Sequence, residues 1–269
     1  MSTYRAGFIG AGNMGGALAV AACKSTDPDR IILADNDRRK AQALADNCNC
    51  MAADNATVAG ESRFVFLGVK PQVLPALLDE IAPVLAMRTD HVVLVTMAAG
   101  ISIDGITKML GETYPIIRIM PNMPVAIGEG MVLYAVNEQV TAEDEQDFLR
   151  LMSAAGCFDK LDEKLIDAGS AVSGCGPAFA YLFMEALADG GVECGLPRDK
   201  ALRYAAQTLL GAAEMTLCSG KHPGELKDAV CSPGGTTIAG VHALEQGALR
   251  NTAMSAVTAA YKRTCELKK

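Results

Sequence analysis

A glycine-rich segment near the start of the chain constrains the fold more than any other feature. Residues 7–15 read GFIGAGNMG, which places the pattern G-x-G-x-x-G directly after an apolar run and directly before a helical stretch. In this setting Gly10 permits a tight turn, Gly12 lets the backbone approach a pyrophosphate, and Gly15 allows close packing of the helix on the strand. Free N–H groups at the helix start then bind the anion. The segment predicts a dinucleotide-binding unit, and a glycine-rich turn without a ligand is the alternative.

Short apolar runs alternate with helical patterns through the first half of the chain. We expect strands at 6–9, 31–34, 64–69, 92–96, 116–120 and 131–136, and helices at 15–24, 38–45, 74–85 and 142–155, the last capped by Thr141. Apolar strands separated by helices are typical of a mostly parallel sheet covered on both faces. The sequence therefore predicts an α/β, Rossmann-like N-terminal domain over residues 1–162.

The second half has a different character. From about residue 162 the alternation stops, and alanine- and leucine-rich helical patterns follow at 178–192, 198–218, 225–230, from 236 and from 248. Residues 163–269 are therefore expected to form an all-α domain. These helices carry many small and apolar side chains that must be buried, and we expect a partner subunit to pack against them. Packing of these helices on the sheet domain is the alternative.

Composition and charge limit the classes of partner. The net charge is -7, from 24 Lys and Arg against 31 Asp and Glu, which argues against a nucleic-acid surface. An anionic ligand must then be held by local backbone dipoles. We find no apolar run near the ~20 residues that a membrane span requires, and no leader sequence, so we expect a cytoplasmic protein that does not contact a membrane.

The cysteines do not indicate a metal site. The nine cysteines are scattered and never spaced C-x-x-C, so we expect reduced thiols. Cys48 and Cys50 resemble half of a metal site, but no second Cys or His pair lies near them in the sequence, and we predict no metal.

The residues after the second predicted strand bear on the choice of coenzyme. Asp35 lies where a carboxylate can bond a free ribose 2'-hydroxyl, whereas Arg38, Arg39 and Lys40 can pair with a 2'-phosphate. A solvated first turn of a helix is the alternative for the basic residues. The sequence leaves NAD and NADP both open.

Six further motifs follow the glycine loop in order. They are VKPQ at 69–72, AAGIS at 98–102, MPNMP at 120–124, SGCGPAF at 173–179, HPGELKD at 222–228 and VCSPGGTT at 230–237. With these motifs the whole chain resembles the pyrroline-5-carboxylate reductase family. The resemblance implies reduction of L-1-pyrroline-5-carboxylate to L-proline with NADH or NADPH, the last step of proline biosynthesis. It also implies a Rossmann domain joined to a helical dimerisation domain, often assembled as a decamer of five dimers.

The resemblance also implies the site residues. The expected coenzyme-binding residues are Gly10, Ala11, Gly12, Asn13, Met14, Asp35, Asn36, Asn55, Val69, Lys70, Pro71, Ala98, Ala99 and Gly100. The expected residues for the imino acid substrate are Met120, Pro121, Asn122, Ser232, Gly234, Gly235, Thr236 and Thr237. Residues 232–237 form a small-residue turn before a helix, whose free N–H groups suit the substrate carboxylate. In the family this turn is shared between subunits, which implies an active site at the dimer interface.

Thr237 matches the family threonine that contacts the ring nitrogen, and we expect it to be the catalytic hydrogen-bond donor. A helix-capping role is the alternative. Two family positions differ here, because Cys175 and Phe179 replace the usual serine and tyrosine, so roles that depend on those hydroxyls do not transfer.

Two other functions compete with this interpretation. A β-hydroxyacid dehydrogenase shares the two-domain plan but needs a lysine general acid early in the second domain, at a place where this chain has Ala180. A dinucleotide-sensing interaction module would bind nucleotide without turnover.

Overall fold

A computed structural model describes residues 2–267, so the outermost residues of the two predicted domains, 1 and 268–269, lie outside it. The chain divides into two compact units. One runs to Cys175 and takes in the chain from Ala260, and the other is Gly176–Ala259. By their contacts, residues 163–175 therefore belong to the first unit. The predicted boundary between a dinucleotide-binding domain and a dimerisation domain, after residue 162, remains a prediction.

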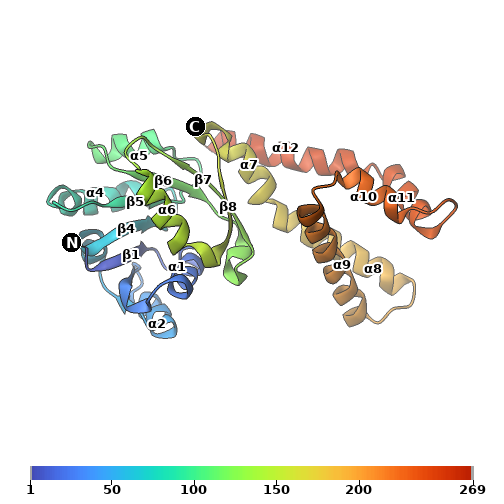
Figure 1. The fold of residues 1–269 in the computed structure, drawn as a ribbon, viewed down its shortest axis with the longest axis horizontal. Helices are drawn as coiled ribbons and strands as arrows, with labels where there is room; N and C mark the ends of the chain where they lie inside the picture. The colour runs from blue at the N-terminus through green and yellow to red at the C-terminus, as the bar shows by residue number, and fades with distance from the viewer. Residues whose placement is uncertain (1, 268–269) are drawn as a thin grey trace. The chain divides into compact units, whose positions relative to one another are not determined.

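The first unit is built on an eight-stranded sheet with the order β3-β2-β1-β4-β5-β6-β7-β8 (Figure 1). The strands are β1 (Tyr4–Ile9), β2 (Ile31–Ala34), β3 (Met51–Ala52), β4 (Ser62–Leu67), β5 (Val93–Thr96), β6 (Ile116–Met120), β7 (Gly130–Val136) and β8 (Gly156–Lys160). Neighbouring strands are parallel except β6 and β7, so the mostly parallel sheet is confirmed. All six predicted strands are present. The sequence missed β3, which has two residues, and β8, which carries polar residues at an edge of the sheet.

Helices connect the strands. They are α1 (Asn13–Ser25), α2 (Arg38–Cys48), α3 (Asn55–Glu61), α4 (Leu74–Ala86), α5 (Ile103–Leu110), α6 (Ala142–Leu151) and α7 (Ile166–Ser173). The four predicted helices are confirmed, although the fourth ends at Leu151 and continues as a 3-10 turn over Ser153–Ala155. The predicted cap of α6 is also confirmed, because the Thr141 hydroxyl accepts the Asp144 N–H at 3.1 Å. The sequence missed the short helices α3 and α5, whose start signals are the caps Asp54 and Ser102.

The sheet is covered on both faces, as its apolar strands require. One buried cluster joins Phe8 and Phe66 to residues of α1, α2 and α6. The other joins Ile9 and Leu67 to residues of α3, α4, α5 and α7. Successive residues of a strand therefore point into different cores, and the sheet is the shared middle layer.

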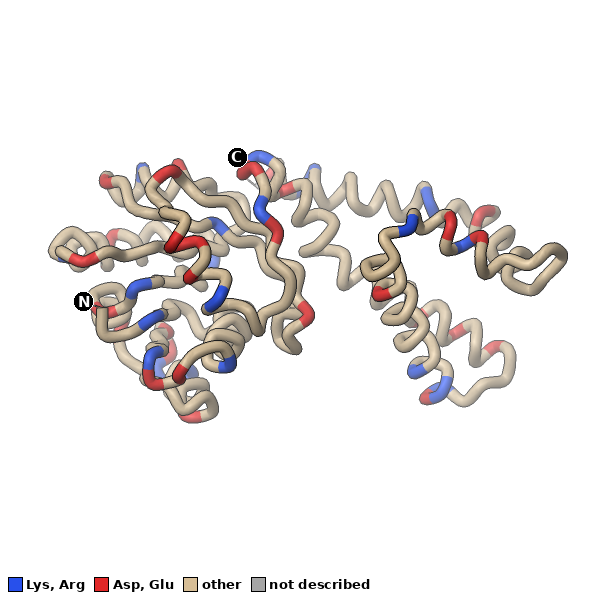
Figure 2. Tube along the Cα trace, in the orientation of Figure 1, with Lys and Arg blue, Asp and Glu red and all other residues tan. Residues whose placement is uncertain are grey.

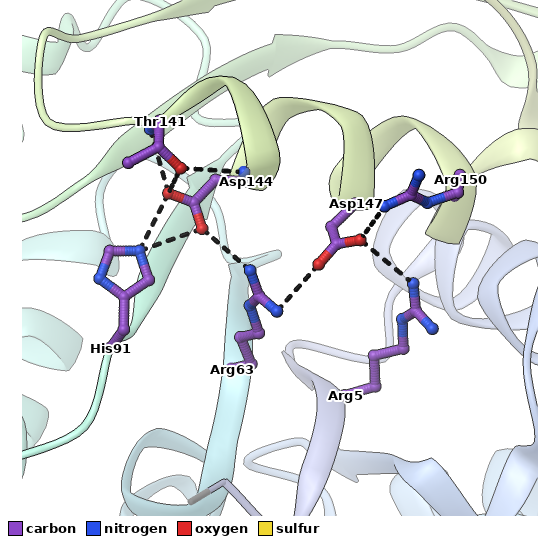
Figure 3. A network of polar contacts seen from close by, with 7 residues as sticks. All are labelled: Arg5, Arg63, His91, Thr141, Asp144, Asp147 and Arg150. Carbon is purple, nitrogen blue, oxygen red and sulfur yellow. Dashed lines mark hydrogen bonds and ion pairs between the residues drawn. The ribbon is translucent and has the colours of Figure 1, made fainter.

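A polar network fastens α6 to the edge of the sheet where the parallel strands begin (Figure 3). Asp144 is almost fully buried and accepts hydrogen bonds from Arg63 at 3.2 Å and from the His91 ring at 2.9 Å. One turn later Asp147 pairs with Arg63 at 2.8 Å. Burial opposes the charge on Asp144, but its hydrogen bonds to Thr141, His91 and Arg63 outweigh burial and lower the pKa of this carboxyl. Each charge in the network has a partner, which is what a structural attachment requires.

A buried arginine fastens α7 to the same sheet. Arg118 lies on β6 with 2% of its side chain exposed, and its guanidinium reaches Glu163 and Asp167, each at 3.0 Å. Glu163 also accepts the Ile103 N–H at 2.8 Å, which draws α5 into the arrangement. The segment that leads out of the N-terminal unit is therefore held by ionic contacts from inside the fold.

The second unit is helical throughout its regular elements. It contains α8 (Gly176–Glu193), α9 (Arg198–Ser219), α10 (Pro223–Val230), α11 (Thr236–Gln246) and most of α12 (Leu249–Leu267). The five predicted helices are confirmed. Its buried cluster in the described chain is small, consisting of Ala188, Ala201 and Ala205. Larger apolar side chains such as Leu182, Leu210 and Leu217 are exposed.

The helical stretch Glu163–Glu193 differs from the expectation that no segment is apolar enough to span a membrane. It is long and apolar enough to cross a membrane by length and composition, and 11% of its most apolar window is buried. No charged residue lies between Asp167 and Glu185, as Figure 2 illustrates. The search for unbroken apolar runs missed this stretch because glycines and serines interrupt it. One such helix is a weak indication of a membrane, since a helix that packs on another subunit has a similar composition.

Candidate functional site

The glycine loop lies where β1 and β4 end side by side. The Gly10 N–H donates to the carbonyl of Ala34 at 2.8 Å, and the Gly68 N–H donates to the carbonyl of Ile9 at 2.7 Å. These bonds hold the loop between the ends of β2 and β4. The connections of the sheet change direction at the β1–β4 pair, and α/β proteins bind ligands at such a point.

The three glycines of the motif have different neighbours. A Cβ on Gly10 would lie 2.6 Å from the Gly68 carbonyl oxygen, and Gly10 has a φ of +107°. A Cβ on Gly15 would lie 2.1 Å from the Gly10 carbonyl oxygen. A Cβ on Gly12, by contrast, would meet nothing within 4 Å. Packing therefore requires glycine at positions 10 and 15, while Gly12 borders open space at the start of α1.

That open space belongs to a cleft of about 450 Å³ at the carboxyl edge of the sheet. The structure brings seven of the predicted coenzyme residues together around it: Gly10, Gly12, Asp35, Asn36, Asn55, Val69 and Lys70. The sequence missed Ile9, Gly68 and the side of the cleft formed by α4 and its N-cap, through Val73, Ala76, Leu77 and Glu80. A glycine directly after an apolar strand was the available signal for Gly68; the α4 residues carried no comparable signal.

The charged side chains that line the cleft are the carboxylates of Asp35 and Glu80 and the ammonium of Lys70. Asp35 accepts the Ala11 N–H at 2.7 Å and the Asp37 N–H at 2.9 Å, so its carboxylate is fixed at the end of β2. The Asn55 amide donates to Glu80 at 3.1 Å. Arg38 lines a different cavity, of about 360 Å³, with Asp54 and Gln42. In the cleft itself, Lys70 is the cation among the lining residues that the structure describes.

The other predicted coenzyme residues do not line this cleft. Ala11, Asn13 and Met14 belong to the same turn and helix start, and Pro71 follows Lys70. Residues 98–100 follow β5 at the same edge of the sheet, with Ala98 buried and Ala99 exposed. A contact between these residues and the coenzyme remains a prediction.

Met120, Pro121 and Asn122 continue this edge at the end of β6. Pro121 is buried, and the Asn122 amide donates to the Ser173 carbonyl at 2.9 Å and accepts the Met131 N–H at 2.9 Å. The Asn122 side chain thus joins the strand end to β7 and α7. Its first role in this structure is to position the chain around the predicted substrate residues.

The predicted substrate turn lies in the second unit, at the start of α11. Gly234 has a φ of +68°, and the Gly235 N–H donates to the Ser232 carbonyl at 3.0 Å, which closes the turn. Gly235 is the N-cap, so Thr237 is the second residue of the helix and does not cap it. Thr236 and Thr237 are exposed, and amides in the first turn of a helix have no partner within the helix. The turn offers free donors for a carboxylate next to an accessible hydroxyl.

These two sets of residues suit different anions. The cleft in the first unit combines a glycine loop, a helix start and a fixed carboxylate, which are the elements that hold a dinucleotide. The space next to Gly12 is where a pyrophosphate would approach the backbone. The turn before α11 suits a small carboxylate.

Models of two protein families match parts of the chain. Residues 163–267 match the model for pyrroline-5-carboxylate reductase dimerisation. Residues 5–100 match the model for coenzyme F420-dependent NADP oxidoreductases. The second match covers most of the parallel strands and the glycine loop.

Relatives match over nearly the full length. The chain is 43% identical to a pyrroline-5-carboxylate reductase of Pisum sativum over 267 residues, which cover 98% of this chain and 96% of the relative. It is 43% identical to pyrroline-5-carboxylate reductase 2 of Bos taurus over 268 residues, which cover 97% of this chain and 83% of the relative.

Solved structures agree with these matches. The Coxiella burnetii pyrroline-5-carboxylate reductase is 32% identical with a TM-score of 0.91, and the match covers 100% of both chains. The Plasmodium falciparum pyrroline carboxylate reductase with NADP bound is 30% identical with a TM-score of 0.88, also over 100% of both chains. From the glycine loop to the last helix, the chain belongs to the pyrroline-5-carboxylate reductase family.

Proposed function

We propose that this protein reduces L-1-pyrroline-5-carboxylate to L-proline with NAD(P)H, the last step of proline biosynthesis. The observation that carries the proposal is that the chain contains both kinds of site: a cleft around Gly12 in the first unit that suits a dinucleotide, and a turn before α11 in the second unit that suits a carboxylate. Full-length identity to pyrroline-5-carboxylate reductases supports it. The test is loss of the reduced nicotinamide absorbance when the purified protein is mixed with pyrroline-5-carboxylate and each coenzyme in turn. No loss with either coenzyme would refute the proposal.

The chemistry places modest demands on the protein. A bound reduced nicotinamide supplies the hydride. The chain must hold the imine carbon within about 3.5 Å of the hydride donor and stabilise a protonated or hydrogen-bonded ring nitrogen. In the proposal, the amides before α11 hold the substrate carboxylate, the Thr237 hydroxyl contacts the nitrogen, and residues 120–122 border the ring.

The protein acts as a homodimer in this proposal, and the helices of the second unit form the interface. The match to the family's dimerisation model supports the dimer. The exposed leucines of α8 and α9 support the interface, because each buried leucine contributes about 1.5–3 kcal/mol. A decamer of five dimers remains a proposal from the family resemblance. We also propose a cytoplasmic location, in keeping with a small-molecule biosynthetic reaction.

Replacing Thr237 with alanine should lower kcat about tenfold, the effect of losing one hydrogen bond to a charged group in the transition state. Coenzyme affinity should not change, because the coenzyme cleft is formed by other residues. Thr237→Ser is the matched control, since it keeps the hydroxyl and should retain most of the rate. Equal kcat values for the wild-type and Ala proteins would exclude Thr237 from the reaction.

A subunit-mixing experiment tests whether two chains share each active site. Dimers that combine a Gly12→Val chain with a Thr237→Ala chain contain one undamaged site if coenzyme and threonine come from different chains. A random mixture should then recover about one quarter of the wild-type rate. If each chain builds its own site, every site carries a defect and the mixture will show no recovery.

The fixed Asp35 carboxylate leads to a prediction about coenzyme preference. Replacing Asp35 with serine should raise the NADPH to NADH ratio of kcat/KM about tenfold, because one carboxylate near the ribose repels a 2'-phosphate. Asp35 also holds the Ala11 N–H, so Asp35→Asn is a necessary comparison that keeps an acceptor and removes the charge. A ratio that stays constant in both variants would show that other groups select the coenzyme.

A further inference from the structure

Three arginines lie side by side at the edge of the sheet where the parallel strands begin. Arg30 directly precedes β2, Arg5 is the second residue of β1, and Arg63 is the second residue of β4. These three strands are neighbours in the order β2-β1-β4. The residue after Arg5 pairs with the residue after Arg30 on one side and with the residue after Arg63 on the other. The three arginines therefore occupy one level of the sheet, and we call them the arginine row.

Folding alone does not account for the arginine row. Neighbouring strands lie about 4.8 Å apart, so the three side chains start close together. Like charges at opposed positions of neighbouring strands destabilise a sheet. Where a fold departs from such a rule, a functional site is a common reason. The row was not visible in the sequence, because each arginine stands alone before its own apolar run.

One carboxylate, that of Asp147 on α6, faces the arginine row (Figure 3). It pairs with Arg63 at 2.8 Å, and it also pairs with Arg150 outside the row. Its distance to Arg5 is 3.8 Å, which is too long for a hydrogen bond. Arg30 forms no ion pair within residues 2–267. The charge of Arg63 is thus compensated, whereas those of Arg5 and Arg30 are left largely without a counter-charge.

The arginine row borders a cavity of about 360 Å³. The lining consists of the arginine row, Ser2, Tyr4 and Asp147. Three guanidinium groups and one carboxylate leave this lining with an excess of two positive charges. Asp27 and Asp29 belong to the turn that carries Arg30, but neither lines the cavity. The local excess contrasts with the net charge of the chain, which is -7, and it suits an anion.

The cavity is separate from the coenzyme cleft. The strand β1 begins at the cavity and ends at the glycine loop, and Gly10 lies five positions after Arg5. At the rise of a strand, this separation is roughly 16 Å. None of the described residues lines both the cavity and the cleft. An anion in the cavity would therefore be a second ligand and not a part of the dinucleotide.

We propose that the arginine row binds a phosphate group, as the free ion or as the phosphate ester of a small metabolite. A phosphate group carries about 1.5 to 2 negative charges at pH 7, which matches the excess in the lining. Guanidinium groups present paired N–H donors that fit phosphate oxygens. Asp147 holds Arg63 in position, and the phosphate bridges Arg5 and Arg30, whose charges have the least compensation.

Calorimetric titration with inorganic phosphate tests the proposal. The full-length Gly12→Val protein is used, because this substitution is expected to block the anion site of the glycine loop. Sodium chloride is titrated at matched ionic strength. We expect one phosphate to bind per chain, with no corresponding binding of chloride. Arg30→Gln and Arg5→Gln, each made in this background, should raise the dissociation constant for phosphate about tenfold, since each removes a charged hydrogen-bond donor.

Lys108→Gln is the matched control. It removes one positive charge from the same unit, at a side chain that is 75% exposed and lines neither the cavity nor the cleft. Its affinity for phosphate should equal that of the parent protein. The unfolding midpoint in phosphate-free buffer separates binding from a structural role. Arg30→Gln should not lower this midpoint, because it removes one charge from a row of like charges.

Glycerol 3-phosphate, titrated in the same way, distinguishes the two sources of phosphate. Binding of both the ester and the free ion supports a metabolite ligand, and binding of the free ion alone supports inorganic phosphate. The proposal is overturned if the Gly12→Val protein binds no phosphate, or if its Arg30→Gln and Lys108→Gln derivatives bind phosphate equally well. If Gly12→Val folds poorly, the wild-type and Arg30→Gln proteins are compared directly, and the variant should lose one bound phosphate per chain.

Discussion

Replacing Gly12 with valine should strongly weaken coenzyme binding while leaving the fold intact. Gly12 has a φ of -71° and a ψ of -174°, which valine adopts readily, and a Cβ at this position meets nothing within 4 Å. The new side chain would occupy the space through which a pyrophosphate reaches the free amides of α1. We expect the dissociation constant for NAD(P)H to rise about 100-fold or more, equivalent to ~3 kcal/mol. Calorimetric titration measures this change.

Gly15→Ala is the informative comparison for this variant. Its Cβ would lie 2.1 Å from the Gly10 carbonyl oxygen, so the helix must move and the protein should lose stability. The unfolding midpoint should therefore fall for Gly15→Ala and remain close to wild type for Gly12→Val. Wild-type coenzyme affinity in the Gly12→Val protein would mean that the dinucleotide binds elsewhere.

Replacing Arg118 with alanine should produce the largest loss of stability from a single substitution that we predict. The change removes the guanidinium that balances Asp167, whose side chain is 4% exposed, and it leaves a cavity in the sheet layer. Removing one partner of a buried ion pair lowers the free energy of unfolding by about 3–5 kcal/mol. Because the chain has no tryptophan, urea unfolding is best followed by circular dichroism, at one fixed protein concentration for the dimer.

Two comparisons separate the buried charge from other effects. The Arg63 side chain also forms ion pairs, but it is 32% exposed. Arg63→Ala should therefore lower the free energy of unfolding by nearer ~1 kcal/mol. The double variant Arg118→Met/Asp167→Leu removes both buried charges and should regain part of the stability lost in Arg118→Ala. A loss below about 1 kcal/mol for Arg118→Ala would contradict the interpretation that this pair anchors α7.

The fold was largely predictable because its signals are local. Short, mostly apolar runs such as 31–34 and 116–120 indicate covered strands, and the structure confirms both. The missed elements have weak local signals. The strand β3 has only two residues, and the edge strand β8 keeps its side chains partly or fully exposed, so neither has the apolar run of a central strand.

The candidate site was predictable only where backbone geometry carries the function. The glycine motif led to the loop at the cleft because the close approach to Gly68 and the turn at Gly10 require specific residues. No such signal marks Glu80 of the cleft or the ion pair between Arg118 and Asp167. The partner of a charged residue within an apolar pattern can be identified only in the folded chain.

The sequence by itself determined the mostly parallel sheet, the helical second half and the glycine loop, because each depends on side-chain periodicity or on backbone freedom within a few residues. Tertiary structure alone decided which of the glycines faces open space, and that Asp35 is fixed against the loop while Arg38 lines another cavity. Those facts depend on distances between residues that are far apart in the chain, and such distances are set by the packing of complete elements.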